Sequence, residues 1–230
     1  MMIRFLAVLV AALAPSLALA QAVTAPVLKV GNKFILQRTN VLVQGNPDAK
    51  SWDIHRTVTA VSSQGVMMDE FRGKNPEKFV LDLTPELNIR AINDRRFEPF
   101  YPELKFPLAA GDRWDSKVSF DRPGGGNIIY RLSHEAASEE IVVPAGTFRV
   151  IRIEVKGWYN ATNGTGGSGA GQNKQTIWYA PDVGHIVQLH FQETDWKGQP
   201  YTEYRLALKS TNIIGVKVAT GATTIPVPTR

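Results

Sequence analysis

Apolar and polar residues alternate along much of this chain with the period of two that is typical of β-strands. From Ile151 to Lys156 the odd-numbered residues are aliphatic and the even-numbered residues are charged. The same period recurs from Val187 to Gln192 and from Glu203 to Lys209. Such alternation places one face of a strand against a core and the other face in water. We predict about eleven strands, near residues 34–43, 52–61, 66–72, 78–83, 113–120, 127–135, 139–143, 147–159, 174–180, 185–194 and 201–209.

Clusters rich in glycine and proline separate the predicted strands, at residues 62–65, 122–126, 144–146 and 181–184. These residues supply the backbone angles that tight turns require. No segment shows a clean amphipathic helix, because prolines interrupt the best one, between Arg96 and Lys105. The pattern predicts an all-β domain at 21–212, with under roughly 10% helix. We expect an antiparallel meander that forms a curved sheet or a partly closed barrel.

The residues from Asn93 to Ala110 are predicted to be a connector between two halves, which leaves open whether the chain has one domain or two. The last residues, 213–230, contain Pro226 and Pro228 and are predicted to be a flexible tail.

The apolar phase changes within one predicted strand. Phe148 and Val150 occupy even positions, whereas Ile151, Ile153 and Val155 occupy odd positions. A uniform strand would send these two sets to opposite faces. We therefore predict either a β-bulge near Val150 or a second layer that covers Phe148 and Val150.

One short pattern occurs twice. It consists of a glycine, an asparagine or aspartate, a cationic residue and an aromatic residue. The first copy begins at Gly31 and the second at Gly111. A duplication would explain the repeat, but only the glycine is identical, so coincidence or one turn chemistry that is used twice is favoured.

The first twenty residues have the features of a secretory signal peptide. Arg4 precedes an apolar run from Phe5 to Ala14, and Ala18 and Ala20 are the small residues that a signal peptidase reads. We predict cleavage before Gln21 and a periplasmic or secreted protein with no transmembrane anchor after cleavage.

The composition narrows the function. The chain has no cysteine, which excludes disulfides, thiolate metal sites and lipid attachment to a cysteine of this sequence. Its 26 basic and 21 acidic residues are dispersed, so we expect no nucleic-acid partner, which would need a basic stripe or cluster.

Familiar catalytic and cofactor motifs lack their required context. Residues 164–169 match G-x-G-x-x-G, but a strand pattern follows where a dinucleotide site needs a helix. His185 and His190 are five residues apart, so they face opposite sides of one strand. We therefore predict no catalytic residue, cofactor or metal site, although a carboxylate pair assembled across strands remains open.

Two tryptophans are the candidate binding residues. Trp158 is in phase with Arg152, Glu154 and Lys156, and Trp178 is in phase with the polar side of its own strand. The two indoles could stack on a sugar ring or contact an apolar partner. The alternative is that another layer covers them and makes them core residues.

One block of sequence resembles a known group. The block has two turn motifs on either side of a predicted strand. The first is Val143-Pro144-Ala145-Gly146-Thr147-Phe148, and the second is Trp178-Tyr179-Ala180-Pro181-Asp182-Val183-Gly184. Over about residues 106–195 the chain is similar to the TapB-like group of uncharacterised bacterial exported domains. The resemblance implies a secreted β-rich domain and transfers no catalytic residue.

Together these observations favour an exported, non-catalytic domain that binds an apolar ligand, an envelope polymer or an envelope protein. A secreted hydrolase with residues assembled across strands, and a purely structural envelope factor, remain as alternatives. An apolar concavity would favour ligand binding, and a cluster of histidines or carboxylates in a pocket would favour the enzyme.

Overall fold

The computed structural model describes residues 22–213, and the only regular secondary structure in this range is β-strand. The predicted signal peptide and all but the first residue of the predicted tail lie outside the described residues. No helix that could span a membrane occurs within 22–213. The strands are β1 Lys33–Val43, β2 Asn46–Pro47, β3 Ser51–Ser62, β4 Gly65–Arg72, β5 Lys78–Leu83, β6 Ile89–Ile92, β7 Arg95–Tyr101, β8 Arg113–Asp121, β9 Asn127–Val143, β10 Gly146–Thr162, β11 Ser168–Ala180, β12 His185–Thr194 and β13 Pro200–Thr211.

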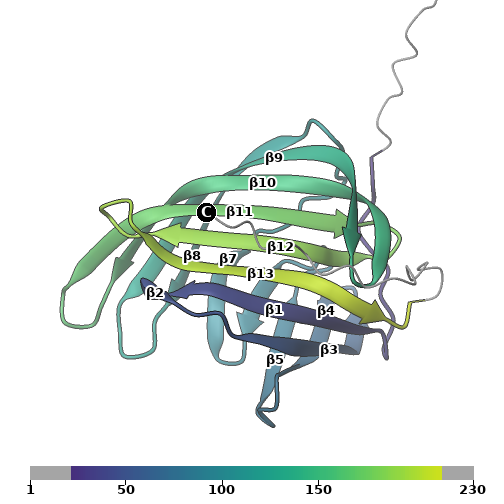
Figure 1. Cartoon of the computed structure of the whole chain (residues 1–230), viewed down its shortest axis with the longest axis horizontal. Coiled ribbons are helices and arrows are strands. Elements are labelled where there is room, and N and C mark those ends of the chain that lie inside the picture. Colours follow the sequence, from purple (N-terminus) through teal and green to yellow (C-terminus); the bar gives the residue numbers. More distant parts are fainter. Residues whose placement is uncertain (1–21, 214–230) are drawn as a thin grey trace, which may run out of the picture.

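The strands form one antiparallel sheet that closes on itself. Apart from the short β2, which pairs with β1 alone, each strand pairs with its neighbours in sequence, and β13 returns to pair with β1. Leu36 lies opposite Leu208 and Arg38 lies opposite Leu206 in this closing pair. The predicted all-β antiparallel meander is confirmed, and its closure into a barrel is complete (Figure 1).

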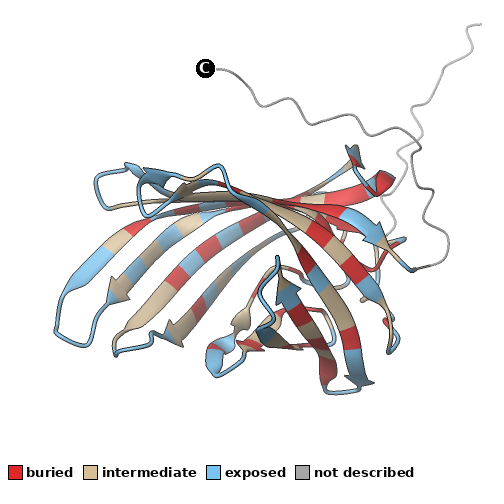
Figure 2. Cartoon of the chain, turned by 60° about the horizontal axis from the view of Figure 1, so that its bottom comes forward, coloured by how far each residue is buried: buried red, intermediate tan, exposed pale blue. Residues whose placement is uncertain are grey.

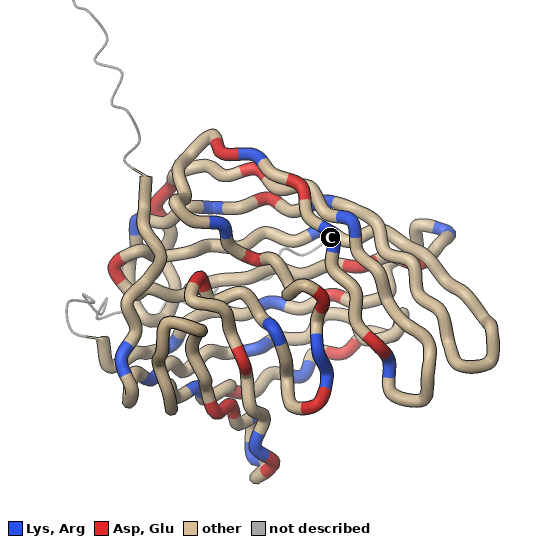
Figure 3. The backbone as a smooth tube through the Cα atoms, turned by 180° about the vertical axis from the view of Figure 1, so that it is seen from behind, with Lys and Arg blue, Asp and Glu red and all other residues tan. Residues whose placement is uncertain are grey.

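The barrel interior holds a continuous hydrophobic core. Alternate residues of each strand point inward, as Phe34 and Leu36 of β1 and Ile153 and Val155 of β10 illustrate. Figure 2 shows the hairpin tips at one end of the barrel as mainly exposed, whereas buried positions concentrate toward the middle and the other end. Lysine, arginine and acidic residues are interspersed along the chain, with both signs on neighbouring strands (Figure 3).

Part of the predicted connector, residues Arg95–Tyr101, forms strand β7 of the same sheet. β7 pairs with β6 on one side and with β8 on the other. Its ladder with β8 has a single pair in the described residues, Glu98 with Ser119. Pro99 follows directly and has no backbone N–H to donate. The prolines of the segment weaken the strand pattern in the sequence. For this reason β7 was difficult to predict.

The segment after β7 packs into the barrel instead of running over its surface. The Asn88 side-chain oxygen accepts hydrogen bonds from the backbone N–H groups of Glu103 and Leu104, both at 2.8 Å. The Asn88 amide donates to the Leu104 carbonyl at 2.8 Å. Leu104 and Leu108 are buried, and the backbone of Leu108 pairs with Val23. Asn88 thereby takes the place of a strand neighbour and fixes Glu103 at the barrel wall.

The predicted bulge near Val150 is wrong. The pairing of β10 with β9 and with β11 runs without a register shift. Phe148 and Val150 are nevertheless buried. The β9–β10 turn curls over the ends of β11 and β12 (Figure 1), and the Ala145 N–H donates to the Leu208 carbonyl of β13 at 3.0 Å. The folded end of the hairpin therefore provides the second layer that the changed apolar phase requires.

The repeated Gly-Asn and Gly-Asp pattern does correspond to one turn used twice. Asn32 and Asp112 each accept a hydrogen bond from the backbone N–H three residues earlier, at 2.7 Å in both cases. Gly31 and Gly111 both have positive φ, at 87° and 93°. These turns start β1 and β8, and only glycine adopts this backbone conformation without strain.

Candidate functional site

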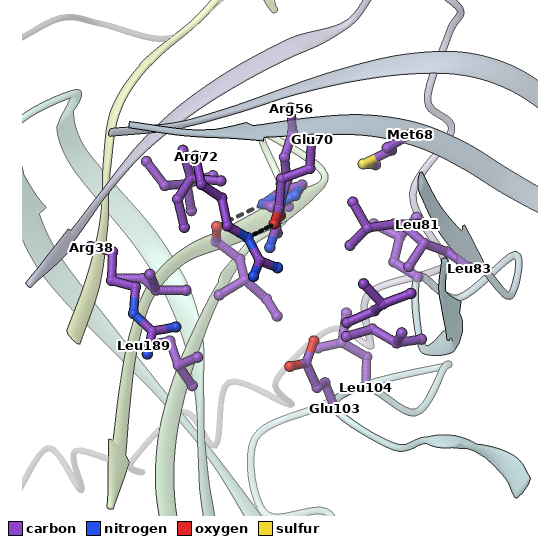
Figure 4. A pocket seen from close by; sticks show the side chains of 18 of the residues that line it. Arg38, Arg56, Met68, Glu70, Arg72, Leu81, Leu83, Glu103, Leu104 and Leu189 are labelled. Carbon is purple, nitrogen blue, oxygen red and sulfur yellow. Dashed lines mark hydrogen bonds and ion pairs between the residues drawn. The ribbon is translucent and has the colours of Figure 1, made fainter. Parts of the chain in front are cut away.

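A cavity of about 320 Å³ lies inside the barrel, between the β1–β6 wall and strands β12 and β13. We call it the barrel cavity. Aliphatic side chains form most of its lining, and several charged side chains project into it (Figure 4). The aliphatic part consists of Leu36, Ile54, Leu81, Leu83, Leu87, Ile89, Ile92, Leu104, Ile186, Leu189 and Leu206.

Strand register places a group of charged residues on one wall of the cavity. Arg56 of β3 lies directly opposite Glu70 of β4, and Arg72 follows two residues later on the same inward face. Arg38 projects from the adjoining strand β1. We call these four residues the arginine cluster. In the view of Figure 4 they lie across the cavity from Leu81 and Leu83 of β5.

Glu70 organises two of these arginines. Its two carboxylate oxygens accept hydrogen bonds from Nε of Arg56 at 2.7 Å and from Nε of Arg72 at 2.6 Å. The Glu70 side chain is only 1% exposed. Burial by itself would raise the pKa of Glu70, but the charges and hydrogen bonds of the two arginines outweigh it and lower that pKa. Glu70 is therefore ionised and holds both guanidinium groups in place.

Arg38 has no carboxylate partner among the described residues. Its Nε donates to the Asn40 side chain at 3.0 Å, and its guanidinium lies 3.7 Å from the centre of the Tyr204 ring. Burial lowers the pKa of Arg38 below its ordinary value of 12.5, which still leaves the side chain charged at neutral pH. The stacking on Tyr204 orients a cation at the cavity wall.

Glu103 and His185 are further titratable groups in the cavity lining. Glu103 has no side-chain hydrogen bond within residues 22–213, and burial raises its pKa to about 7, an effect that the charge of Arg56 partly offsets. His185 stacks on Phe34 with ring centres 4.1 Å apart. Burial lowers the pKa of His185 to about 3, so this imidazole is neutral at physiological pH.

A second polar group inside the barrel has a different character. Tyr130 donates to Glu193 at 2.8 Å, and the Asn173 amide donates to the same carboxylate oxygen at 3.1 Å. The Gln175 amide donates to Tyr101 at 2.6 Å and to the Asn173 oxygen at 2.8 Å. We call these five residues the tyrosine network. Burial raises the pKa values of Tyr101, Tyr130 and Glu193.

Sequence reasoning missed the arginine cluster, although a signal for it exists. Arg38 lies on the same inward face of β1 as Phe34 and Leu36. Glu70 and Arg72 lie on the same inward face of β4 as Met68. A charged residue at an apolar position of a strand must be paired or must face a polar cavity. The strand phase therefore identifies these residues as unusual, but only the folded structure shows that they converge.

The structure does not bring the two candidate tryptophans together. β10 and β11 pair as expected, but Trp158 lies opposite Gln172 and Trp178 lies opposite Arg152. This difference of six positions separates them by roughly 20 Å along the strands. Trp158 is 60% exposed. Trp178 is partly buried and donates its indole N–H to Glu139. They form no common platform on this face.

The remaining motifs have structural roles. The glycine-rich segment 164–169 spans the β10–β11 turn and the start of β11, where Asn163 accepts hydrogen bonds from the backbone of Thr165 and Gly167. His185 faces the cavity, while His190 on the outer side of β12 contacts Glu203 at 2.8 Å. Within residues 22–213 no group of three or more histidines or carboxylates is arranged to hold a metal ion.

Comparisons with known proteins yield structural neighbours only. No family model matches the sequence, and a search of curated proteins also finds no match. The crystal structure of a "putative lipoprotein" from Parabacteroides distasonis aligns at 13% identity with a TM-score of 0.48, covering 84% of this chain and 100% of that chain. A "putative exported protein with YmcC-like fold" from Bacteroides fragilis aligns at 16% identity with a TM-score of 0.47 and the same coverage. The function is therefore inferred from the barrel cavity.

Proposed function

We propose that this chain is an exported, non-catalytic binding protein that holds a small apolar ligand inside its barrel. The observation that carries the proposal is the cavity of about 320 Å³ within the closed sheet. Export rests on the signal-peptide pattern of residues 1–20 and on the resemblance to TapB-like domains, and both remain predictions.

The size and lining of the cavity support this function. Ligand sites in proteins commonly measure about 300–1,000 Å³ and are mostly apolar with a few placed polar groups. At about 30 Å³ for each water-sized group, the barrel cavity holds on the order of ten non-hydrogen atoms. Packed protein interiors contain few voids of this size, because an unfilled cavity lined by aliphatic groups is destabilising. A ligand that fills the space would recover this lost stability.

A small aliphatic alcohol is a suitable probe for this function. The chain from Gln21 onward should bind decan-1-ol, measured by calorimetry, and its thermal midpoint should rise with the alcohol concentration. The variants Leu189→Phe and Leu81→Phe should weaken this binding, since each adds volume at the cavity wall. A matched control is Gln192→Phe, which introduces phenylalanine on the outer face of β12, away from the cavity.

Native mass spectrometry provides an independent measurement. The protein purified from the envelope of its source organism should carry a retained molecule, which Leu189→Phe should lose and Gln192→Phe should keep. Absence of decan-1-ol binding by the folded unmodified protein, together with no retained molecule, would contradict the proposal.

The hydrolase alternative has one supporting observation. Glu103 places a carboxyl group with a pKa of about 7 in the cavity, and a general base functions best when its pKa is near the operating pH. If the chain is a hydrolase, it should cleave short acyl esters, and Glu103→Gln should abolish that activity. Binding without turnover would favour the non-catalytic function.

A further inference from the structure

The arginine cluster leaves many hydrogen-bond donors unused. Glu70 engages only the Nε atoms of Arg56 and Arg72, and Asn40 engages only the Nε of Arg38. No group within residues 22–213 accepts a hydrogen bond from the terminal guanidinium nitrogens of these arginines. Each guanidinium carries four N–H donors on those nitrogens.

These donors open onto the cavity. In the described residues, the buried side-chain polar atoms without a partner are Ser116 Oγ and Arg152 Nε, so the terminal nitrogens of the cluster are not enclosed by protein. All three arginines line the barrel cavity together with its aliphatic side chains. A group that enters the cavity therefore meets preformed donors beside an apolar wall.

The charges in the cavity do not balance. Arg38, Arg56, Arg72 and Arg95 line it, whereas its carboxyl groups are Glu70 and Glu103. Because burial raises the pKa of Glu103 to about 7, this group is substantially protonated near neutral pH and opposes an incoming anion less than an ordinary carboxylate would. His185 is neutral and adds no charge. The excess positive charge in a partly desolvated site favours an anionic ligand.

We infer that the ligand is an amphiphile whose anionic head, a carboxylate or a phosphate, binds Arg38, Arg56 and Arg72, and whose short aliphatic chain lies against Leu81, Leu83 and Leu189. This inference rests on the proposed function and specifies its ligand. Carboxylate and phosphate groups match the planar fork of a guanidinium. Glu70 positions the two arginines that it pairs and leaves their forks free.

The cavity volume sets the chain length. Room for on the order of ten non-hydrogen atoms corresponds to a fatty acid of about eight to ten carbons. Longer chains would have to leave the cavity or expand it. Affinity should therefore be highest near octanoate and decanoate and should not rise further at hexadecanoate.

Three probes with one chain length test the head group by titration calorimetry on the chain from Gln21 onward. Decanoate or decyl phosphate should bind at least about tenfold more tightly than decan-1-ol. A tenfold difference in affinity corresponds to the free energy of one hydrogen bond to a charged group. A preference for decanoate over decyl phosphate, or the reverse, identifies the head group.

Arg38→Gln is the informative variant, because Arg38 has no ion pair whose loss would disturb the fold. It should weaken decanoate binding about tenfold and decan-1-ol binding much less, because the alcohol loses one hydrogen bond but no charge interaction. Arg38→Lys should recover part of the affinity, since it restores the charge without the fork. Arg205→Gln removes a charge from the outer face of β13 and should change neither affinity.

The results separate the inference from the proposed function. Equal affinities for decan-1-ol and the anions, or an Arg38→Gln variant that binds decanoate normally, would overturn the inference and leave apolar ligand binding intact. Failure of all three probes to bind the folded protein would overturn the proposed function as well.

Discussion

The arginine cluster and the tyrosine network are both polar groups inside one barrel, yet they differ in how their hydrogen bonds are completed. In the tyrosine network Glu193 accepts from Tyr130 and Asn173, and Gln175 links Asn173 to Tyr101. The donors and acceptors mainly satisfy one another. In the arginine cluster the carboxylate is satisfied, but the terminal guanidinium donors have no partner in the described residues.

This difference indicates different roles. A buried polar network with satisfied members stabilises one arrangement of a core. Donors that are held in place and left open to a cavity are preorganised for a ligand. The tyrosine network should therefore contribute mainly to stability, and the arginine cluster mainly to binding, with Glu70 as the exception that contributes to both.

The largest expected effect is that of Glu70→Gln. This change removes the charge that pairs Arg56 and Arg72, and breaking a buried ion pair typically costs about 3–5 kcal/mol. Urea denaturation should show a loss at the lower end of this range, roughly 3 kcal/mol, because the arginines keep some access to water in the cavity. Glu135→Gln is the control. Its ion pair with Arg113 is exposed to solvent, so this change should leave the free energy of unfolding almost unaltered. Similar small losses for both variants would show that Glu70 does not organise the cluster.

Tyr130→Phe tests the tyrosine network. Removal of the hydroxyl deprives Glu193 of one of its two hydrogen bonds, so the free energy of unfolding should fall by roughly 1–2 kcal/mol. The affinity for decanoate should not change, in contrast to Arg38→Gln. Tyr201→Phe, at a partly exposed position without a side-chain hydrogen bond in the described residues, should have almost no effect. A Tyr130→Phe protein with normal stability but weaker decanoate binding would reverse the roles of the two groups.

Trp178→Ala and Trp158→Ala test the outer face, where sequence analysis placed the binding residues. Trp178 is partly buried and hydrogen-bonded to Glu139, so its truncation should lower stability by about 1 kcal/mol or more. Trp158 is 60% exposed, and its truncation should stay within about 0.5 kcal/mol. Losses of several kcal/mol in both variants would make both tryptophans core residues. Loss of envelope-polymer binding in folded variants would instead support an outer binding site and weaken the case for the cavity.

The last test is a pH dependence at Glu103. The pKa of Glu103 rises from its ordinary value of 4.5 to about 7 in the folded state, so the folded protein binds this proton more tightly than the unfolded chain. The contribution of Glu103 to stability is therefore complete below pH 4.5 and is lost as the pH rises through about 7. Glu103→Gln should be more stable than the unmodified protein at pH 8, and this advantage should diminish as the pH falls toward 5. Thermal midpoints across this range measure the difference, and a constant difference would contradict the raised pKa.

The alternation of residues by itself determined most of the strands and the all-β antiparallel class. Residues 151–156 alternate strictly, and the Gly31 and Gly111 turns are where their chemistry indicates, because side-chain phase and turn geometry are local properties. The short strands β6 and β7 were missed, since four residues are too few for a periodic signal and Pro99 weakens the pattern.

Only the tertiary structure decided how the barrel closes and what its interior does. Phe34 pairs with Thr211, and no local pattern specifies a partner that far along the chain. The strand phase identifies four charged residues on inward faces: Arg38, Arg56, Glu70 and Arg72. Their convergence depends on the register of β1, β3 and β4. Glu103 enters the same cavity from a proline-containing segment that Asn88 anchors. The sequence specifies which residues face inward, whereas the three-dimensional pairing of distant strands brings their charges together.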